Sequence, residues 1–203
     1  MVRLAPPPPG RDIKPSHVTV AAGTPLVRIY DPIHLGPATY NHNGPRGRFD
    51  HHAPASPPAD DPAHGVYYAA LTLAGCLVEV FGDTGIIAVD GHRIAVVEPP
   101  RPLKLLQLRG RGAWDAGTTA AVTKDSDRSF TQEWGRFFHT DARYGSVDGL
   151  SYANAHDDAQ AYALFERTGS LTVVDDCPLA DSRLEAEIEA IAIAFGMIVD
   201  RAR

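Results

Sequence analysis

The sequence predicts an α+β fold, with a single compact domain in which helices flank a mixed or antiparallel central sheet. First, short β-favouring runs bounded by Gly, Pro, Asn and Asp dominate the middle of the chain. Second, helical segments are interspersed without the strict alternation that a parallel βαβ architecture requires. Third, 203 residues, 44% of them hydrophobic and 22% charged, suffice for one well-filled core.

Composition also excludes several function classes. The net charge of −6 argues against general nucleic-acid binding. No apolar run approaches the roughly 20 residues that span a bilayer, and the start MVRLAPPPPG lacks the apolar core of a secretory signal. We therefore expect a cytoplasmic protein without membrane association. Cys76 and Cys177 form no disulfide framework or metal-ligand spacing and are interpreted as buried thiols.

The chain divides into an arm and a domain. Residues 1–24 contain Pro6 to Pro9 and little periodicity, which predicts an extended or poorly ordered Pro-rich arm. Residues 25–203 form the predicted domain.

The first predicted strand is Pro25 to Tyr30, PLVRIY. Alternation places Leu26, Arg28 and Tyr30 on one face and Val27 and Ile29 on the other. A charge that shares a face with Leu and Tyr is unusual for a solvated strand. Arg28 therefore either binds a ligand or lies at a sheet edge with its charged end in solvent.

The central stretch runs from Gly47 to Val80. Val66 to Tyr68 predicts a short strand, and Thr72 is a plausible N-cap for the helix that follows. The apolar side of this helix is expected to comprise Leu73, Leu77, Val80 and Phe81. Glu79 is the only charge on it, and a carboxylate is costly to bury without a partner. Glu79 therefore lies at a surface edge or has a function.

The loops before this strand carry histidines. Residues 34–46 are rich in Gly, Pro and Asn and lead into Gly47-Arg48-Phe49. The loop 51–64, HHAPASPPADDPAH, invites a zinc hypothesis, but its histidines have no recognised ligand spacing. We predict no bound metal, and a mobile lid or surface insertion.

Further strands are predicted at 86–89, 93–98 and 103–108, with Asp90-Gly91 suited to a hairpin. Residues 110–119, around Trp114, are predicted to be a glycine-rich loop.

The last third alternates helices and strands. Ser126 or Asp127 can cap a helix that ends near Thr140 and whose stripe comprises Phe130, Trp134, Phe137 and Phe138. A turn at 154–158 precedes strands at 161–166 and 171–174. Ser182 and Glu185 predict a capping box for a final helix that buries Leu184, Ile188, Ile191, Phe195 and Ile198.

Four segments together resemble the RES domain family: VRIY (27–30), GRFD (47–50), YYAALTLAGCLVEV (67–80) and DGLSYANA through ALFER (148–167). The resemblance spans roughly residues 25–165. It implies a fold similar to that of ADP-ribosyltransferase toxins, and an activity that degrades NAD as the toxin half of a RES-Xre toxin–antitoxin pair.

The resemblance also assigns site residues. The family's two arginines fall on Arg28 and Arg48, its tyrosine on Tyr68 and its glutamate on Glu79. The position of its serine, in the pattern DGxxYxSA, is occupied by Asn154.

These residue types suit NAD cleavage. Two arginines can bind the pyrophosphate with paired charge-assisted hydrogen bonds. A glutamate can bind ribose hydroxyls and stabilise an oxocarbenium-like transition state. We expect catalytic roles for Glu79, Arg28, Tyr68 and Asn154, and binding roles for Arg28, Tyr30, His42, Arg48 and Tyr68.

The implied function is an NAD-consuming toxin that cleaves the nicotinamide–ribose bond by hydrolysis or phosphorolysis, with NAD as substrate and no cofactor. Protein ADP-ribosylation and a degenerate, non-catalytic nucleotide- or partner-binding member are the alternatives, the latter because of Asn154. The implied partner is a cognate Xre-type helix-turn-helix antitoxin, in a homodimer or toxin–antitoxin hetero-oligomer. No role is assigned to the remaining histidines, among them His34, His92, His139 and His156.

Overall fold

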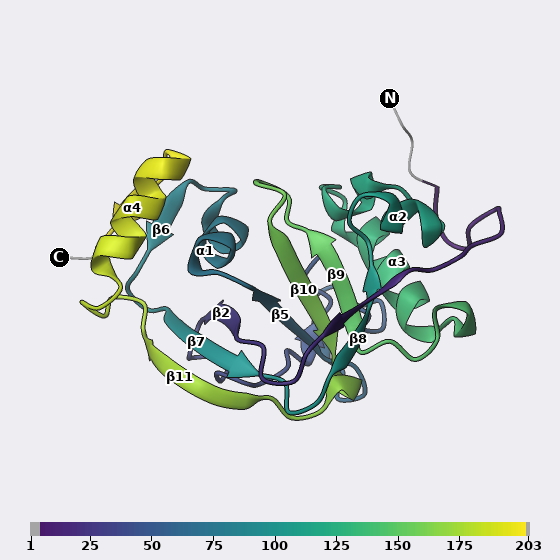
Figure 1. Cartoon of the computed structure of the whole chain (residues 1–203), viewed down its shortest axis with the longest axis horizontal. Helices are drawn as coiled ribbons and strands as arrows, with labels where there is room; N and C mark the ends of the chain where they lie inside the picture. Colours follow the sequence, from purple (N-terminus) through teal and green to yellow (C-terminus); the bar gives the residue numbers. More distant parts are fainter. Residues whose placement is uncertain (1–4, 202–203) are drawn as a thin grey trace.

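The computed structural model describes residues 5–201, which form a curled mixed sheet with helices against it (Figure 1). Its eight strands lie in the order β1 (His17–Val20), β8 (Leu103–Gln107), β9 (Gly149–Ala153), β10 (Gln160–Phe165), β5 (Val66–Ala70), β2 (Leu26–Tyr30), β7 (Arg93–Glu98) and β11 (Thr172–Pro178). Within the described residues, β8 and β9 are the one parallel pair of this sheet, and its other neighbouring strands pair antiparallel. The predicted α+β class and mixed sheet are confirmed.

The other elements surround this sheet. The helices are α1 (Leu73–Phe81), α2 (Arg111–Asp115), α3 (Arg128–Thr140) and α4 (Glu185–Phe195), with 3₁₀ turns η1 (Ala120–Thr123), η2 (Ala142–Tyr144) and η3 (Glu166–Thr168). Two small sheets pair β6 (Ile86–Ala88) with β12 (Ile198–Asp200) and β3 (Asn43–Gly44) with β4 (Ala59–Asp60). Figure 1 shows α4 at one end of the molecule and α2 and α3 at the other. Within residues 5–201, no helix has both the length and the apolar character to span a bilayer.

The predicted caps of two helices are present. Thr72 has extended backbone geometry and its side chain accepts a hydrogen bond from the amide of Gly75, which satisfies one of the free donors at the start of α1. Asp127 does the same for the amide of Phe130 in α3. The α3 aromatics pack into the core, with Trp134 and Phe138 each 1% exposed.

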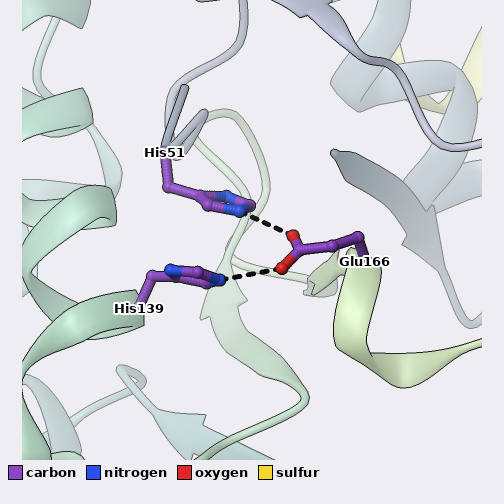
Figure 2. A group of neighbouring side chains, drawn as sticks. All are labelled: His51, His139 and Glu166. Carbon is purple, nitrogen blue, oxygen red and sulfur yellow. Dashed lines mark hydrogen bonds and ion pairs between the residues drawn. The ribbon is translucent and has the colours of Figure 1, made fainter. Parts of the chain in front are cut away.

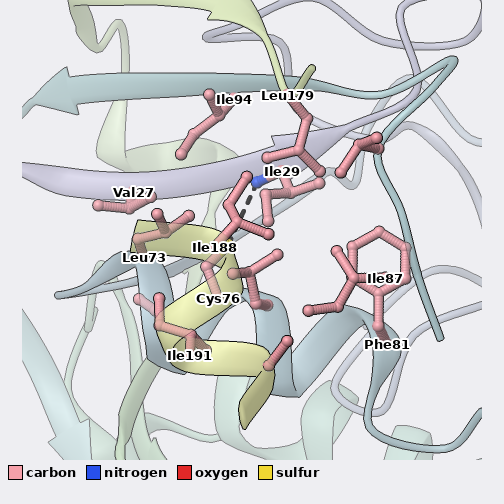
Figure 3. Packing of buried hydrophobic residues seen from close by; sticks show 14 of the residues in the cluster. Val27, Ile29, Leu73, Cys76, Phe81, Ile87, Ile94, Leu179, Ile188 and Ile191 are labelled. Carbon is pink, nitrogen blue, oxygen red and sulfur yellow. Dashed lines mark hydrogen bonds between the residues drawn. The ribbon is translucent and has the colours of Figure 1, made fainter. Parts of the chain in front are cut away.

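Both faces of β2 are buried, and they are divided as its alternation predicts. Val27 and Ile29 pack with α1 and α4 in one hydrophobic cluster (Figure 3), whereas Leu26 and Tyr30 belong to another. The buried Cys76 in α1 accepts a hydrogen bond from the amide of Ile29 at 3.2 Å, so that α1 is fixed to β2. The second cysteine, Cys177, is also buried.

Two local predictions in the middle of the chain are wrong. Asp90-Gly91 does form a turn, but β6 pairs in parallel with β12 while β7 pairs with β2 and β11. A turn signal reports local geometry and leaves the choice of partner strand to packing. Residues 110–119 are not all loop, because α2 forms where Gly112 approaches the backbone of Gln107.

The predicted N-terminal arm also needs correction. Residues 17–20 form β1, which pairs antiparallel with β8 along one edge of the sheet. Edge pairing uses backbone groups, so a segment without apolar periodicity can still join a sheet. Residues 1–4 of the predicted arm lie outside the described residues.

At the C-terminal end the capping box is absent. Leu184 is the N-cap of α4 and makes no side-chain cap, because a turn at Asp181 occupies the preceding residues. The helix ends at Gly196, whose φ of +66° breaks the periodicity. Phe195 and Ile198 are therefore 43% and 67% exposed instead of buried. On α1, Val80 is likewise 44% exposed.

The loop 51–64 is anchored at its start. His51 and His52 are 2% and 0% exposed, and the amide of Ala53 donates to Asp61 at 2.9 Å. The predicted lid or surface insertion is therefore wrong for these first residues, because histidine rings can be buried against aromatic side chains such as Phe165.

Gly135 sets how closely α3 approaches the loop at 47–50. A Cβ built at Gly135 would lie 2.8 Å from the carbonyl oxygen of Phe49, which is backbone and cannot rotate away. We expect Gly135→Ala to lower the free energy of unfolding by about 1–3 kcal/mol in urea denaturation. Gly10→Ala, where nothing lies within 4 Å, is the control and should have a much smaller effect. Equal effects of the two substitutions would contradict this account.

Candidate functional site

A cavity of about 210 Å³ lies where β2 and β5 diverge. The two strands share a single residue pair, Val27 with Ala70, so the sheet splits beside it. The lining comprises Arg28, Ile29, Leu35, Asn41, Val66, Tyr68, Ala69, Ala70, Cys76, Glu79, Val80, Tyr152 and Ala161. Small-molecule sites usually measure about 300–1,000 Å³, so a dinucleotide would extend out of this cavity.

Arg28 is a buried cation in this lining. Its side chain is on β2, the residue is 5% exposed, and its Nη1 donates to the carbonyl of Thr39 at 2.6 Å. The guanidinium lies 4.4 Å from the ring centroid of Tyr67. Burial lowers the pKa of Arg28, with Tyr67 opposing the shift, and no carboxylate in residues 5–201 pairs with it. An arginine desolvated without a counter-charge is available for an anionic ligand.

Glu79 lies in the same cavity and projects from α1. Its Oε1 accepts a hydrogen bond from the hydroxyl of Tyr152 at 3.2 Å, whereas the buried Oε2 has no partner among the described residues. Burial raises the pKa of Glu79 above its ordinary value, with the Tyr152 hydrogen bond and the charge of Arg48 opposing that shift. Glu79 is half-buried, and it lines the cavity.

Tyr68 connects the cavity to the GRFD segment. Its hydroxyl donates to Oδ1 of Asp50 at 2.8 Å and accepts from the amide of Phe49 at 2.9 Å. Asp50 also accepts the amides of Arg46 and Gly47, at 2.6 and 2.8 Å. These bonds hold the backbone on either side of Arg48.

Arg48 itself is half-buried and does not line the cavity. Its Nη1 donates to the carbonyl oxygen of Asp125. Burial raises the pKa of both Glu79 and Tyr152, and the positive charge of Arg48 opposes part of each rise. Arg48 therefore lies near enough to influence the carboxylate electrostatically.

Two further predicted residues lie elsewhere. The hydroxyl of Tyr30 donates to Asp176 on β11 at 2.8 Å. Nδ1 of His42 donates to the carbonyl oxygen of His64, 2.9 Å away. Neither residue lines the cavity.

Asn154 is also outside the lining. It is 1% exposed, and its Oδ1 accepts the amides of His156 and Asp157, each at 2.9 Å. Asparagine favours this arrangement, in which the side chain forms the turn. The turn lies between β9, which carries Tyr152, and β10.

Tyr152 is a residue of the cavity to which the sequence assigned no role. Its phenol is the hydrogen-bond donor to Glu79, and burial together with the adjacent carboxylate holds its pKa well above the ordinary value, so it stays protonated. The tyrosine of the DGxxYxSA pattern was the available signal. The sequence gave no such signal for Tyr67, which contacts the guanidinium of Arg28, or for Asn41, which lines the cavity. Both positions depend on how β5 and the preceding loop pack.

Comparison with known proteins agrees with this architecture. The model of a protein family described as the RES domain matches residues 25–184. Among solved structures, the chain is similar to one in the "Crystal structure of the M.tuberculosis MbcT-MbcA toxin-antitoxin complex", with a TM-score of 0.60 and 14% sequence identity. That similarity covers 85% of this chain and 92% of the other, and at this identity it shows a shared fold. No curated protein matches the chain.

Proposed function

Because the chain belongs to the RES domain family, we propose that it is a toxin of a type II toxin–antitoxin system that cleaves the nicotinamide–ribose bond of NAD. The similar fold of a chain solved within a toxin–antitoxin complex supports the toxin assignment. We further propose that it acts in the cytoplasm and that a helix-turn-helix antitoxin of the Xre type binds it. Such an antitoxin would inhibit the toxin by covering the cavity.

The observation that carries the proposal is that Arg28 and Glu79 line the same cavity. A buried guanidinium without a carboxylate partner faces the same space as a half-buried carboxylate whose Oε2 is buried and unpartnered. NAD offers a complement to each, because its pyrophosphate is anionic and its riboses carry hydroxyl groups. Perturbed ionisable groups that meet in a cavity are typical of active sites.

The geometry suggests a division of roles. Arg28 binds the pyrophosphate through charge-assisted hydrogen bonds, and Tyr68 contacts the ligand with its ring, since its hydroxyl is bound to Asp50. Glu79 accepts a hydrogen bond from a ribose hydroxyl. It also stabilises the positive charge that develops at the anomeric carbon as the bond to nicotinamide breaks. The electron pair of that bond leaves with nicotinamide, and water, phosphate or a protein side chain supplies the new bond to carbon. Asn154 holds the turn after the strand that carries Tyr152.

Glu79 must be ionised for this role, which predicts the pH dependence. Since burial raises its pKa, we expect the acidic limb of kcat against pH to lie above the ordinary pKa of glutamic acid. Tyr152→Phe removes the hydrogen bond that favours the carboxylate, so the limb should move to still higher pH. Steady-state rates at several pH values check this, with Tyr40→Phe as a control. An unchanged limb in Tyr152→Phe would show that another group titrates.

The proposed function is tested with the purified chain, NAD, and buffers with and without phosphate. We expect loss of NAD with stoichiometric release of nicotinamide, and the second product, ADP-ribose or its 1″-phosphate, identifies the acceptor. NAD labelled in its adenylate part distinguishes protein ADP-ribosylation, because the label then stays on protein. Absence of nicotinamide release at enzyme concentrations equal to that of NAD would contradict the proposal.

A further inference from the structure

Three side chains with metal-binding atoms meet away from the cavity, although they are far apart in sequence (Figure 2). His51 follows the GRFD segment, His139 is in the last turn of α3, and Glu166 begins η3. The Nε2 atom of His51 lies 2.7 Å from Oε2 of Glu166, and that of His139 lies 3.0 Å from Oε1. One ligand atom from each residue lies within 4.8 Å of the other two.

The cluster is largely shielded from solvent, and its rings are closely packed. The side chains of His51 and His139 are 0% and 10% exposed, and that of Glu166 is 25% exposed. The two imidazole rings stack with centroids 4.0 Å apart, and Phe165 packs edge-on against both. Both rings therefore present Nε2 to the same carboxylate.

The Nδ1 atoms leave the tautomers open. Neither Nδ1 of His51 nor that of His139 has a partner among residues 5–201, and both atoms are buried. The hydrogen bonds to Glu166 are therefore what favours a proton on Nε2 of each ring. In the other tautomer the proton lies on Nδ1, and the lone pair of each Nε2 points toward the carboxylate. The cluster then offers a metal ion two nitrogen ligands and one oxygen ligand.

We propose that His51, His139 and Glu166 bind a zinc ion. Two imidazole nitrogens and one carboxylate oxygen form a donor set that suits Zn²⁺, whereas Ca²⁺ and Mg²⁺ prefer oxygen ligands alone. Tetrahedral bonds of about 2.0–2.2 Å place neighbouring ligand atoms roughly 3.3 Å apart. The present separations, 2.7 Å to Oε2 and 3.0 Å to Oε1, are close to this value, and binding through one of these oxygens requires the carboxylate to turn.

The zinc ion would stabilise the fold near the cavity without contacting substrate. It links the loop after β3, the end of α3 and the start of η3, and none of the three ligands lines the cavity of Arg28 and Glu79. His51 directly follows Asp50, the carboxylate that binds the hydroxyl of Tyr68. Fixing His51 therefore also fixes the segment that carries Arg48. Water completes the coordination at the fourth position.

The test uses the full chain without an affinity tag, freed of metal with a chelator and then titrated with Zn²⁺. Isothermal titration and competition with a chromophoric chelator measure stoichiometry and affinity, and thermal melting measures stabilisation. Cobalt(II) as a probe adds a visible absorption band that reports a low-coordinate nitrogen and oxygen site. None of these readouts depends on cleavage of NAD.

The variants are His139→Gln, Glu166→Gln and the control His34→Ala. Glutamine at 139 retains a side-chain N–H that can donate to Glu166 but is a poor zinc ligand, so the metal-free chain should still fold. The side chain of His34 is exposed and lies 3.8 Å from Asp31.

We expect one Zn²⁺ per chain and a higher melting temperature with zinc. The affinity for zinc should fall by more than about tenfold in both ligand variants, since even loss of a residue that hydrogen-bonds to a metal ligand costs about 10–100-fold. The control should bind as the parent does. Absence of stoichiometric zinc binding by the parent would overturn the proposal. Unchanged affinity in His139→Gln would overturn it as well, even if Glu166→Gln fails to fold.

Discussion

Glu79→Gln is expected to lower kcat for NAD cleavage by about 10²–10³-fold, the usual effect of removing one group that stabilises transition-state charge. Glutamine keeps the size of the side chain and an oxygen that accepts from Tyr152, but it has no negative charge to offset the developing oxocarbenium ion. Ground-state binding of NAD should change little. Single-turnover rates and equilibrium binding of NAD separate the two effects.

The control for this variant is Glu133→Gln, on the exposed face of α3. It should leave kcat unchanged. The free energy of unfolding at neutral pH should be equal or higher in Glu79→Gln, because burial disfavours the ionised carboxylate that it replaces. A Glu79→Gln variant with full kcat would mean that the charge of this residue has no part in the chemistry.

Arg28→Met should weaken NAD binding by roughly 10- to 150-fold. This loss corresponds to about 1.5–3 kcal/mol, the free energy that a hydrogen bond to a charged group contributes. Unlike most substitutions of buried residues, it should not destabilise the chain strongly. The guanidinium is desolvated and has no carboxylate partner in the described residues, so an apolar side chain of similar length fits the same space between Tyr67 and α1. Titration calorimetry with NAD and urea denaturation measure the two quantities.

Arg183→Met is the matched control for this prediction, since that side chain is 63% exposed and its partner is Asp181. It should alter neither NAD binding nor stability by more than a small amount. If Arg28→Met binds NAD normally, the pyrophosphate is anchored elsewhere. If it loses several kcal/mol of stability, Arg28 has a structural role.

Much of the fold followed from local sequence. The alternation in β2, the cap at Thr72 and the aromatic stripe of α3 depend on neighbours within a few residues, so the sequence predicts them correctly. The hairpin at Asp90-Gly91 failed because β6 reaches a strand more than 100 residues away at 198–200. Likewise, β1 joins the sheet through backbone bonds that leave no pattern in the side chains.

The candidate site divides in the same way. Arg28 and Glu79 were identifiable because a charge on an apolar strand face or helix is unusual, and the resemblance to a family gave them roles. The sequence alone could not show that Tyr152 reaches Glu79, or that Asn154 forms a turn outside the cavity.

The sequence by itself determined the family, the class of fold and the two charged residues of the cavity, because these are recorded in residue type, order and short-range periodicity. Only the tertiary structure decided where the sheet splits and which side chains meet there. It alone brought His139 and Glu166 to His51. Contacts between distant segments arise from packing the whole core, and no spacing along the chain encodes them.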